Sequence, residues 1–372
     1  MSGQKRLRVA VLFGGRSAEH EISILSARNV VEALDRERFE PVLVGIDKEG
    51  RWLVQEEANL LGQSRDPRLV RLNREMPEAY IAPHQATGTT LQTASGPPLA
   101  VDVVFPVLHG PLGEDGCVQG LLTLADVPFV GTGVAGSAVG MDKDIMKRLL
   151  AEAGLPIVPH RVVRAARWSR ARRAVVEEIA ALGATVFVKP ANMGSSVGVS
   201  RARSASEIEA AMDHAFEFDD KVVIESGVQG VREIECAVLG NDEPVASRVG
   251  EIVVSHADGF YSYDAKYVDE HGATTLIPAN LTEEEERAVQ TLAIRTFQTL
   301  ECAGLARVDF FRDQAGAVYV NEVNTLPGFT NISMYPKLFE ASGIGPRELV
   351  TRLIELALER AARRKRLKTS VG

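Results

Sequence analysis

The sequence predicts an α/β protein in which an N-terminal open parallel sheet is followed by two α+β units. First, the chain has 372 residues, which is too long for one ordinary hydrophobic core. Second, strand and helix patterns alternate in its N-terminal part, as is typical of an open parallel sheet. Third, two strand patterns near the C-terminus are joined by a short turn, which predicts an antiparallel hairpin.

The bulk composition is typical of a soluble globular protein, with 45% hydrophobic and 25% charged residues. The formal net charge of -8 disfavours a nucleic-acid partner, and no apolar run is long enough to cross a bilayer. The N-terminal residues lead into an apolar strand without a signal segment, and the three cysteines lack any paired spacing. We therefore expect a cytoplasmic protein with free thiols and no membrane partner.

The first predicted unit, residues 1–136, opens with a strand, a loop and a helix. Its strand patterns are residues 7–13, 41–46 and 101–108. Gly14 and Gly15 end the first strand, and the apolar periodicity that follows predicts a helix from Ser17. Residues 81–100 are rich in Thr, Gly, Pro and Ser, which indicates a surface excursion.

The second and third predicted units cover residues 137–227 and 228–372. In the second, a helix over residues 142–150 precedes two strands that flank another helix; these are residues 185–189, 222–225 and about 206–216. In the third, a strand, a loop and a helix precede the hairpin; these are residues 233–239, 256–279 and the segment from 282. Thr282 and Glu285 form a capping-box pattern at the start of that helix.

The hairpin carries the most informative polar residues of the chain. Asp309 lies in the apolar run 305–311, and Glu322 and Asn324 lie two apart in the strand pattern 318–324. Residues two apart share a face of a strand, and a hard cation prefers such oxygen ligands together with phosphates. The pattern predicts a magnesium-nucleotide site, while a solvated polar face on an edge hairpin remains the alternative.

Two lysines and a glycine-serine loop predict a phosphate site. Lys189 ends a strand and is followed by the loop 194–199, whose exposed amides and hydroxyls include those of Ser195 and Ser196. The loop is not a Walker A motif, and taken alone it is better explained as an ordinary turn. Lys143 supplies a second ammonium group from a separate element, and this combination suits a polyphosphate.

Further carboxylates lie at or near strand ends. Glu225 ends one predicted strand, and Glu233 and Glu235 lie close behind it. We expect such acceptors to bind an adenine amino group or ribose hydroxyls, although each acid singly could be a solvated strand end.

In their order and type, these residues resemble the ATP-grasp fold, and more narrowly the chain resembles the D-alanine:D-alanine ligase family. The segments that carry the narrower resemblance are FGGRSAEHEIS (13–23), LHGPLGEDG (108–116), YDAKY (263–267) and NEVNTLPG (321–328). The resemblance spans nearly the whole chain. It implies an ATP-grasp fold in which the two α+β units enclose ATP.

The resemblance also implies a reaction: ATP-dependent ligation of two D-alanines to D-alanyl-D-alanine, through a D-alanyl phosphate, for peptidoglycan precursor synthesis. It implies ATP and two Mg²⁺ or Mn²⁺ ions, with K⁺ as a candidate activator. The expected partners are the small-molecule substrates D-alanine and ATP, and the expected assembly is a homodimer.

By the same resemblance, particular residues take particular roles. The catalytic residues would be Glu21, Ser195, Tyr267, Arg307 and Gly328. Glu21 would hold the ammonium of the first D-alanine, Ser195 and Tyr267 would link to it across the closed site, and Arg307 with the Gly328 amide would form an oxyanion hole. The substrate-binding residues would be His109, Lys266, Ser333 and Met334. The ATP-binding residues would be Lys143, Lys189, Ser196, Glu225, Val228, Glu233, Lys266 and Asn321, and the metal ligands Asp309, Glu322 and Asn324.

Three points stay open from the sequence. Tyr267 favours an amine as the second nucleophile, but a D-alanine:D-lactate ligase is the sibling alternative. A non-catalytic nucleotide-binding protein is the alternative from another class. The stretch 225–233 is one residue longer than is usual in the family, so the adenine contacts near residues 226–228 are the least defined.

Overall fold

The N-terminal sheet has the strand order β3-β2-β1-β7 in the computed structural model, which describes residues 5–81, 90–255 and 273–368. Strand β1 (Leu7–Gly14) lies between β2 (Phe39–Ile46) and β7 (Val103–Leu108) and is parallel to both, as the sequence predicts. The edge strand β3 (Trp52–Gln55) is antiparallel to β2. Helix α1 (His20–Ala33) begins three residues later than the predicted Ser17, which lies in the preceding turn.

The predicted surface excursion contains part of a second, small sheet. Its antiparallel strands are β4 (Ala79–Ile81), β5 (Thr90–Thr93) and β6 (Leu99–Ala100). The short helix α2 (Glu57–Leu61) precedes them. Two further helices, α3 (Cys117–Leu124) and α4 (Val134–Met141), follow β7 and lead to α5 (Lys143–Glu152). Asp142 caps α5, because its carboxylate accepts from the amides of Asp144 and Ile145.

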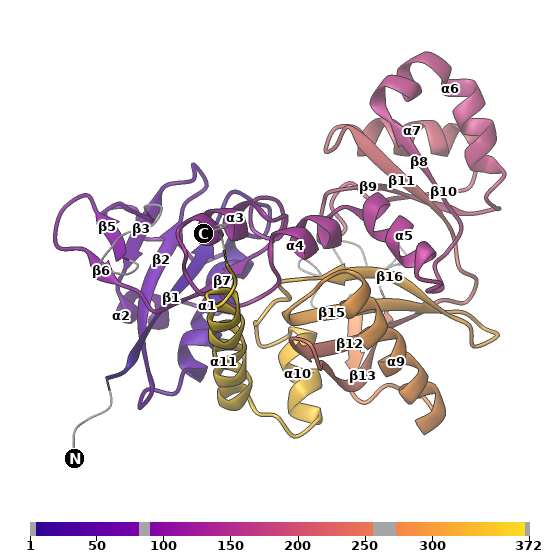
Figure 1. The fold of residues 1–372 in the computed structure, drawn as a ribbon. Coiled ribbons are helices and arrows are strands. Elements are labelled where there is room, and N and C mark those ends of the chain that lie inside the picture. The colour runs from indigo at the N-terminus through magenta and orange to yellow at the C-terminus, as the bar shows by residue number, and fades with distance from the viewer. Residues whose placement is uncertain (1–4, 82–89, 256–272, 369–372) are drawn as a thin grey trace.

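Residues 160–226 form a separate lobe, here called the central lobe, around an antiparallel sheet of order β10-β9-β11-β8. Its strands are β8 (His160–Arg164), β9 (Val186–Pro190), β10 (Ser200–Ala202) and β11 (Lys221–Ser226). Helices α6 (Ala165–Ala180) and α7 (Ala205–Ala215) pack on this sheet and close its core. In Figure 1 the central lobe projects above the rest of the chain.

The third sheet is fully antiparallel, with the order β14-β13-β12-β15-β16. Its strands are β12 (Arg232–Gly240), β13 (Val245–Val254), β14 (Ala273–Leu276), β15 (Gly304–Arg312) and β16 (Val318–Asn324). Helix α9 (Glu283–Thr299) covers one face and begins with the predicted capping box of Thr282 and Glu285. The predicted hairpin of residues 305–324 is confirmed as β15 and β16.

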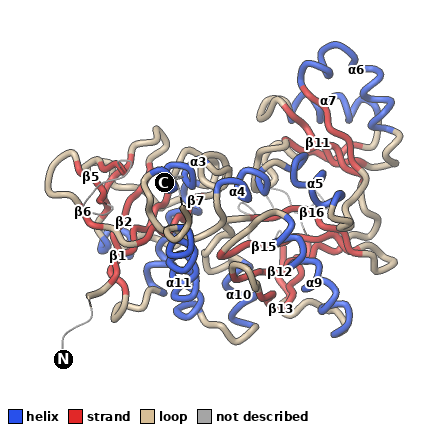
Figure 2. The backbone as a smooth tube through the Cα atoms, in the orientation of Figure 1, coloured by secondary structure: helices blue, strands red, loops and turns tan. Residues whose placement is uncertain are grey.

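The C-terminal helix α10 (Met334–Ala341) packs on β12 and β13 of the third sheet, and α11 (Pro346–Arg364) packs against α1 and β7 of the N-terminal unit. One buried core joins residues of β1, α1 and β7 to Tyr335, Phe339 and Leu353 from these helices. Figures 1 and 2 show α11 lying against the N-terminal sheet, between it and the antiparallel sheet that contains β15. The end of the chain therefore fixes the first unit relative to the hairpin.

Arg360 shows how firmly α11 is attached. Its guanidinium donates to the carbonyl oxygens of Phe129, at 2.9 Å, and Gly131, and it lies 4.9 Å from the centre of the Phe129 ring. Burial lowers the pKa of Arg360 to about 10. The basic C-terminal segment is thus not uniformly solvated, since one of its arginines is anchored in the fold.

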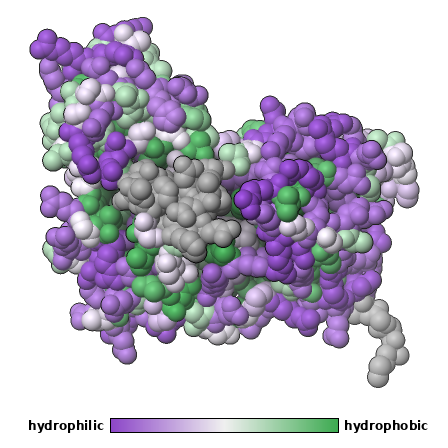
Figure 3. Space-filling view, turned by 180° about the vertical axis from the view of Figure 1, so that it is seen from behind, coloured by the Kyte–Doolittle hydropathy of each residue, from purple (hydrophilic) through white to green (hydrophobic). Residues whose placement is uncertain are grey.

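The exterior is polar over most of the described surface that Figure 3 presents. Among the described residues, no helix is both long and apolar enough to span a bilayer. The three cysteines are free, as expected, with Cys117 exposed and Cys236 and Cys302 buried.

Candidate active site

The hairpin brings its polar residues together across two paired strands. Asp309 lies opposite Glu322, and Arg307 lies opposite Asn324, with an irregularity in the pairing between Asp309 and Phe310. The side-chain amide of Asn324 donates to Oδ2 of Asp309 over 3.0 Å. The three residues that the sequence assigns to one metal site therefore lie together, with Asp309 and Glu322 directly paired and Asn324 hydrogen-bonded to Asp309.

Arg307 is held by two carboxylates. Its Nε and Nη2 each lie 2.7 Å from Asp309, and Nε lies 2.9 Å from Glu235 of the neighbouring strand β12. Burial alone would lower the pKa of Arg307, but these carboxylates outweigh it and raise the pKa well above its ordinary value. Glu235, whose contact with Arg307 the sequence does not reveal, lies directly opposite Asp309 on β12.

The donor set fits a hard divalent cation. Asp309 and Glu322 supply carboxylate oxygens, and the Asn324 side chain can supply an amide oxygen after rotation. In the described parts of the chain, no cluster of three or more His, Cys, Asp or Glu side chains is placed to hold a metal. An ion here would thus complete its shell with water and phosphate oxygens, as Mg²⁺ commonly does.

Two predicted phosphate-binding lysines point toward the hairpin from different elements. Lys143, the first residue of α5, donates from Nζ to the carbonyl of Met193 over 2.7 Å and lies 3.5 Å from Glu322. Lys189, at the end of β9, donates to Oδ1 of Asn321 over 3.1 Å. Ammonium groups from the central lobe and α5 therefore meet the acidic end of β16.

Glu225 lies between two lysines. Its Oε2 is 2.7 Å from Lys189 and its Oε1 is 2.7 Å from Lys147, a fully buried residue that the sequence analysis does not single out. Burial opposes ionisation, but the two ammonium groups outweigh it and lower the pKa of Glu225 to about 2. Glu233 also acts electrostatically on Lys189, while Val228 lies half-buried in the loop before β12.

The glycine-serine loop has an unusual backbone. Ser195 and Ser196 have φ angles of 51° and 59°, a left-handed conformation that L-residues seldom adopt in succession. The loop closes on itself, since the amide of Val197 donates to the carbonyl of Gly194 over 3.0 Å. A methyl group on Gly194 would lie 3.5 Å from Oε2 of Glu19, so this loop also borders the N-terminal unit.

Glu19 and Glu21 lie in different surroundings. Glu19 is 9% exposed, lies beside Gly110 and Gly194, and acts electrostatically on His109. Glu21, the residue that the sequence indicates, pairs with Lys48 at 2.8 Å with its side chain 26% exposed. Glu19, which the sequence does not indicate, thus lies at the border between the N-terminal unit and the glycine-serine loop.

His109 connects the N-terminal sheet to the segment after β16. Its Nδ1 lies 3.1 Å from the carbonyl of Leu326, and its Nε2 lies 3.3 Å from Oγ of Ser26. Ser26 Oγ in turn accepts from the amide of Phe329 over 3.1 Å. Burial lowers the pKa of His109, with Glu19 opposing the change.

Glu114, which the sequence analysis does not single out, makes a second connection to the same segment. Its carboxylate accepts from the amides of Gly110, at 2.7 Å, and Leu326, at 3.3 Å. Burial raises the pKa of Glu114 to about 8, and the nearby charge of Glu19 adds to the rise. This carboxyl group therefore holds its proton near neutral pH.

Gly328 and Ser333 are in close contact beyond β16. A methyl group on Gly328 would lie only 2.7 Å from Oγ of Ser333, so a larger residue would displace that hydroxyl. Ser333 precedes α10, whose first residue is Met334, and its Oγ accepts from the amide of Thr330 over 2.9 Å. A helix N-terminus of this kind favours a carboxylate.

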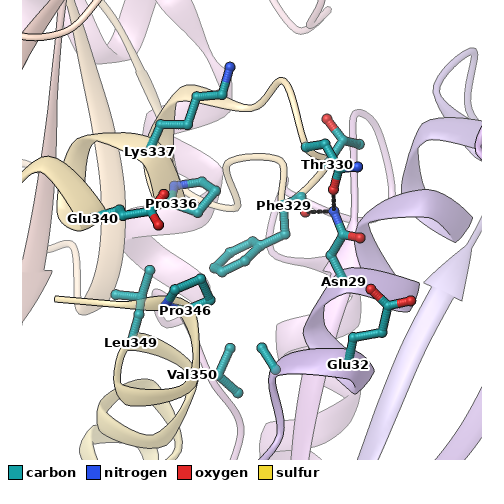
Figure 4. Close-up of a pocket in the computed structure, with 12 residues that line it drawn as sticks. Asn29, Glu32, Phe329, Thr330, Pro336, Lys337, Glu340, Pro346, Leu349 and Val350 are labelled. Carbon is teal, nitrogen blue, oxygen red and sulfur yellow. Dashed lines mark hydrogen bonds between the residues drawn. The ribbon is translucent and has the colours of Figure 1, made fainter.

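A pocket of about 460 Å³ lies between α1, α10 and α11 (Figure 4). Figure 4 shows Asn29 donating to the carbonyl of Phe329, a bond of 2.7 Å, which holds this segment to α1. None of the residues that line this pocket is a predicted site residue. The pocket therefore borders the segment that follows Gly328, through Phe329 and Thr330, without containing a predicted site residue.

Lys266 and Tyr267 fall within residues 256–272, outside the described part of the chain. The other predicted site residues are described, and most lie at the edges where α5, the central lobe, the hairpin and the N-terminal sheet approach one another. Such an arrangement can bind a nucleotide polyphosphate beside a small ligand with a carboxylate.

Comparisons with known proteins agree with this arrangement. The chain matches the family descriptions "D-ala D-ala ligase N-terminus" over residues 8–132 and "D-ala D-ala ligase C-terminus" over residues 149–355. It is 53% identical to a D-alanine–D-alanine ligase of Shouchella clausii, covering 98% of both chains. It is 50% identical to D-alanine–D-alanine ligase A of Escherichia coli, covering 99% of this chain and 100% of the relative. The solved D-alanine–D-alanine ligase of Coxiella burnetii superposes with a TM-score of 0.84 at 38% identity, over 97% of each chain.

Proposed function

The chain belongs to the D-alanine–D-alanine ligase family, and we propose that its described site joins two D-alanine molecules to D-alanyl-D-alanine at the expense of ATP. The observation that carries this proposal is the meeting of Lys143 and Lys189 with the acidic end of the hairpin. Carboxylate activation by ATP needs positive charge around the phosphates and oxygen ligands for a metal in one place.

The reaction consists of two substitutions. A carboxylate oxygen of the first D-alanine forms a bond to the γ-phosphorus of ATP, the bond to ADP breaks, and D-alanyl phosphate results. The amine of the second D-alanine then forms a bond to the acyl carbon, loses a proton, and expels inorganic phosphate. Lys143 and Lys189 stabilise the negative charge on the transferring phosphoryl group.

Asp309, Glu322 and Asn324 are the proposed metal ligands, for two Mg²⁺ or Mn²⁺ ions with K⁺ as a candidate activator. Divalent ions at this position would neutralise phosphate charge and orient the phosphoryl group. The two hydrogen bonds from Arg307 hold the Asp309 carboxylate in one orientation before an ion binds. The other proposed ATP-binding residues are Asn321, Glu225, Glu233, Ser196, Val228 and Lys266.

The first D-alanine is proposed to bind between the N-terminal sheet and the glycine-serine loop. Its ammonium needs a carboxylate; the sequence indicates Glu21, while burial and the nearness of Gly194 favour Glu19. Hydrogen bonds to Leu326 and Ser26 fix the ring of His109, and the fixed ring would orient this substrate. Arg307 and the Gly328 amide are the proposed oxyanion hole for the tetrahedral intermediate.

The second D-alanine is proposed to place its carboxylate at the N-terminus of α10, on Ser333 and the amide of Met334. Ser195, with Lys266 and Tyr267 from the part of the chain that the structure does not describe, is proposed to close over both substrates. Closure would exclude water, which otherwise hydrolyses an acyl phosphate. Tyr267 favours an amine over D-lactate as the nucleophile.

The wider context is proposed from the family. The dipeptide would enter peptidoglycan precursor synthesis in the cytoplasm, and the active assembly would be a homodimer. The proposed units remain residues 1–136, 137–227 and 228–372, with the qualification that α10 and α11 share a core with the first unit.

The proposal is tested by measuring phosphate release with ATP, Mg²⁺ and D-alanine, followed by product identification by mass spectrometry. We expect dipeptide in a one-to-one ratio with phosphate, little reaction with L-alanine, and no depsipeptide when D-lactate accompanies D-alanine. Glu322→Gln should lose turnover, because it removes the negative charge of a proposed metal ligand. A wild-type protein that binds ATP but forms no dipeptide would contradict the proposal.

A further inference from the structure

Lys147 is a fully buried lysine without a role in the reaction as proposed above. It lies four residues after Lys143 on α5, one helical turn further along, and its side chain is 0% exposed. A buried ammonium group loses its hydration, which costs several kcal/mol unless other groups compensate. The contacts of Lys147 therefore require an explanation.

Four residues, whose contacts include this ammonium group, form a closed ring: Lys147, Glu225, Lys189 and Asn321. Glu225 contacts Lys147 through Oε1 and Lys189 through Oε2, each at 2.7 Å. Asn321 closes the ring, because its backbone carbonyl accepts from Lys147 over 3.4 Å and its side-chain oxygen accepts from Lys189 over 3.1 Å. Each lysine is thus held by the same two residues.

The ring joins four elements. Lys147 comes from α5, Glu225 and Lys189 from β11 and β9 of the central lobe, and Asn321 from β16 of the hairpin. Beside it, the amide of Val320 donates to the carbonyl of Pro156 over 2.8 Å, a second connection to the hairpin. The ring therefore sets where the Lys189 ammonium lies relative to Glu322 and its neighbours.

Charge explains what Lys147 adds. Lys189 and Glu225 alone would form a neutral pair, whereas the two protonated lysines and one carboxylate together carry a net charge of +1, and Glu322 attracts both ammonium groups from outside the ring. An ammonium group has three donors, and the contacts to Glu225 and Asn321 use two of those on Lys189. Because Lys147 shares the Glu225 charge, Lys189 keeps attraction for a nucleotide that a tight neutral pair would lose.

Stability alone does not account for Lys147. Well-packed apolar residues often replace a buried ion pair without loss of stability, so such a pair is weak evidence for a stabilising role. The ring contains Lys189, a proposed phosphate-binding residue, and bridges two sheets, so it can fix the orientation of the Lys189 ammonium group. We infer that Lys147 is a positioning residue for nucleotide binding, which acts through Glu225 and Asn321 to hold Lys189 in place.

The inference rests on the proposed function only for the role of Lys189, and its test separates the two. Lys147→Met keeps an unbranched side chain that is one atom shorter and removes its charge. We expect this variant to weaken ADP binding about tenfold in titration calorimetry with Mg²⁺, a loss that corresponds to one charge-assisted hydrogen bond. The KM for ATP should rise similarly, while the KM for D-alanine changes less than about twofold.

Arg360→Met is the matched control, since Arg360 is another buried cation and binds the carbonyls of Phe129 and Gly131 instead of the ring. It should lower the unfolding free energy and leave ADP affinity within about twofold of wild type. A merely structural role for Lys147 predicts instead that both variants lower stability and neither one changes ADP affinity selectively.

Coupling to Glu225 provides the second readout. In a Glu225→Gln background, Lys147→Met should change ADP affinity less than about twofold, because the carboxylate that Lys147 holds is gone. This double variant removes the buried charges of Lys147 and Glu225 together and leaves no uncompensated carboxylate, so it remains informative if Lys147→Met alone does not fold. Undiminished ADP affinity in a folded Lys147→Met protein, or full additivity with Glu225→Gln, would overturn the inference. Absence of dipeptide synthesis by the wild type would instead refute the proposed function and leave the ADP titrations interpretable.

Discussion

Replacement of Glu19 and of Glu21 by glutamine distinguishes the two candidate partners of the substrate ammonium. Glu19 is 9% exposed and lies at the border with the glycine-serine loop, so a contact with the substrate would be a buried, charge-assisted one. Such contacts contribute about 1.5 to 3 kcal/mol, and Glu19→Gln should therefore lower kcat/KM for D-alanine about 10- to 150-fold. Glu21 pairs with Lys48, whose side chain is 59% exposed. An exposed pair of this kind contributes only about 0 to 1 kcal/mol to stability. Because Glu21 contacts Lys48, we expect Glu21→Gln to lower kcat/KM for D-alanine less than about fivefold.

The assay is phosphate release at saturating ATP over a range of D-alanine concentrations, with circular dichroism to verify folding. ADP affinity of both variants serves as the control and should stay close to that of wild type, since neither acid is a proposed nucleotide ligand. A large loss in Glu21→Gln together with a small loss in Glu19→Gln would refute the reasoning from burial and restore the choice that the sequence indicates.

Two further predictions concern stability. Glu114 has a pKa of about 8 in the folded protein against an ordinary 4.5, so between these values the folded state binds more protons and stability falls as pH rises, by up to about 1.4 kcal/mol per pH unit. Glu114→Gln should remove this component in urea unfolding at pH 5, 6.5 and 8, and an unchanged slope would contradict the assignment. Thr282→Ala removes the cap of α9 and should lower the unfolding free energy by about 1 kcal/mol without changing KM for either substrate. Thr282→Ser retains the hydroxyl and the cap, and equal stability of the two variants would contradict a capping role.

Much of the fold follows from local patterns in the sequence. The apolar runs of β1 and β7 predict buried parallel strands because both faces of such strands are covered. The hairpin and the cap at Thr282 are likewise predictable, since alternation, turn residues and capping pairs are short-range features. The metal ligands are predictable for the same reason, because the pairing of the neighbouring strands β15 and β16 is enough to bring Asp309 opposite Glu322.

Other features depend on tertiary structure. Strand β8 and helix α6 are rich in arginine, and the helix is interrupted by non-helical angles at Ala171, so its apolar period is broken. Helical periodicity cannot orient Glu19 and Glu21, because Glu19 lies in the cap before α1. Lys147 has the pattern of an ordinary surface lysine on α5, and only the packing of β11 and β16 reveals that it is buried.

The proposed reaction depends on activation of the D-alanine carboxylate by phosphoryl transfer before the peptide bond forms. The most direct measurement uses D-alanine labelled with ¹⁸O in both carboxylate oxygens and follows the label into inorganic phosphate by mass spectrometry or ³¹P NMR. We predict one ¹⁸O atom in each phosphate released with dipeptide, because the oxygen that attacks phosphorus leaves with it. Phosphate that carries no label, released together with dipeptide, would show that the carboxylate is not phosphorylated.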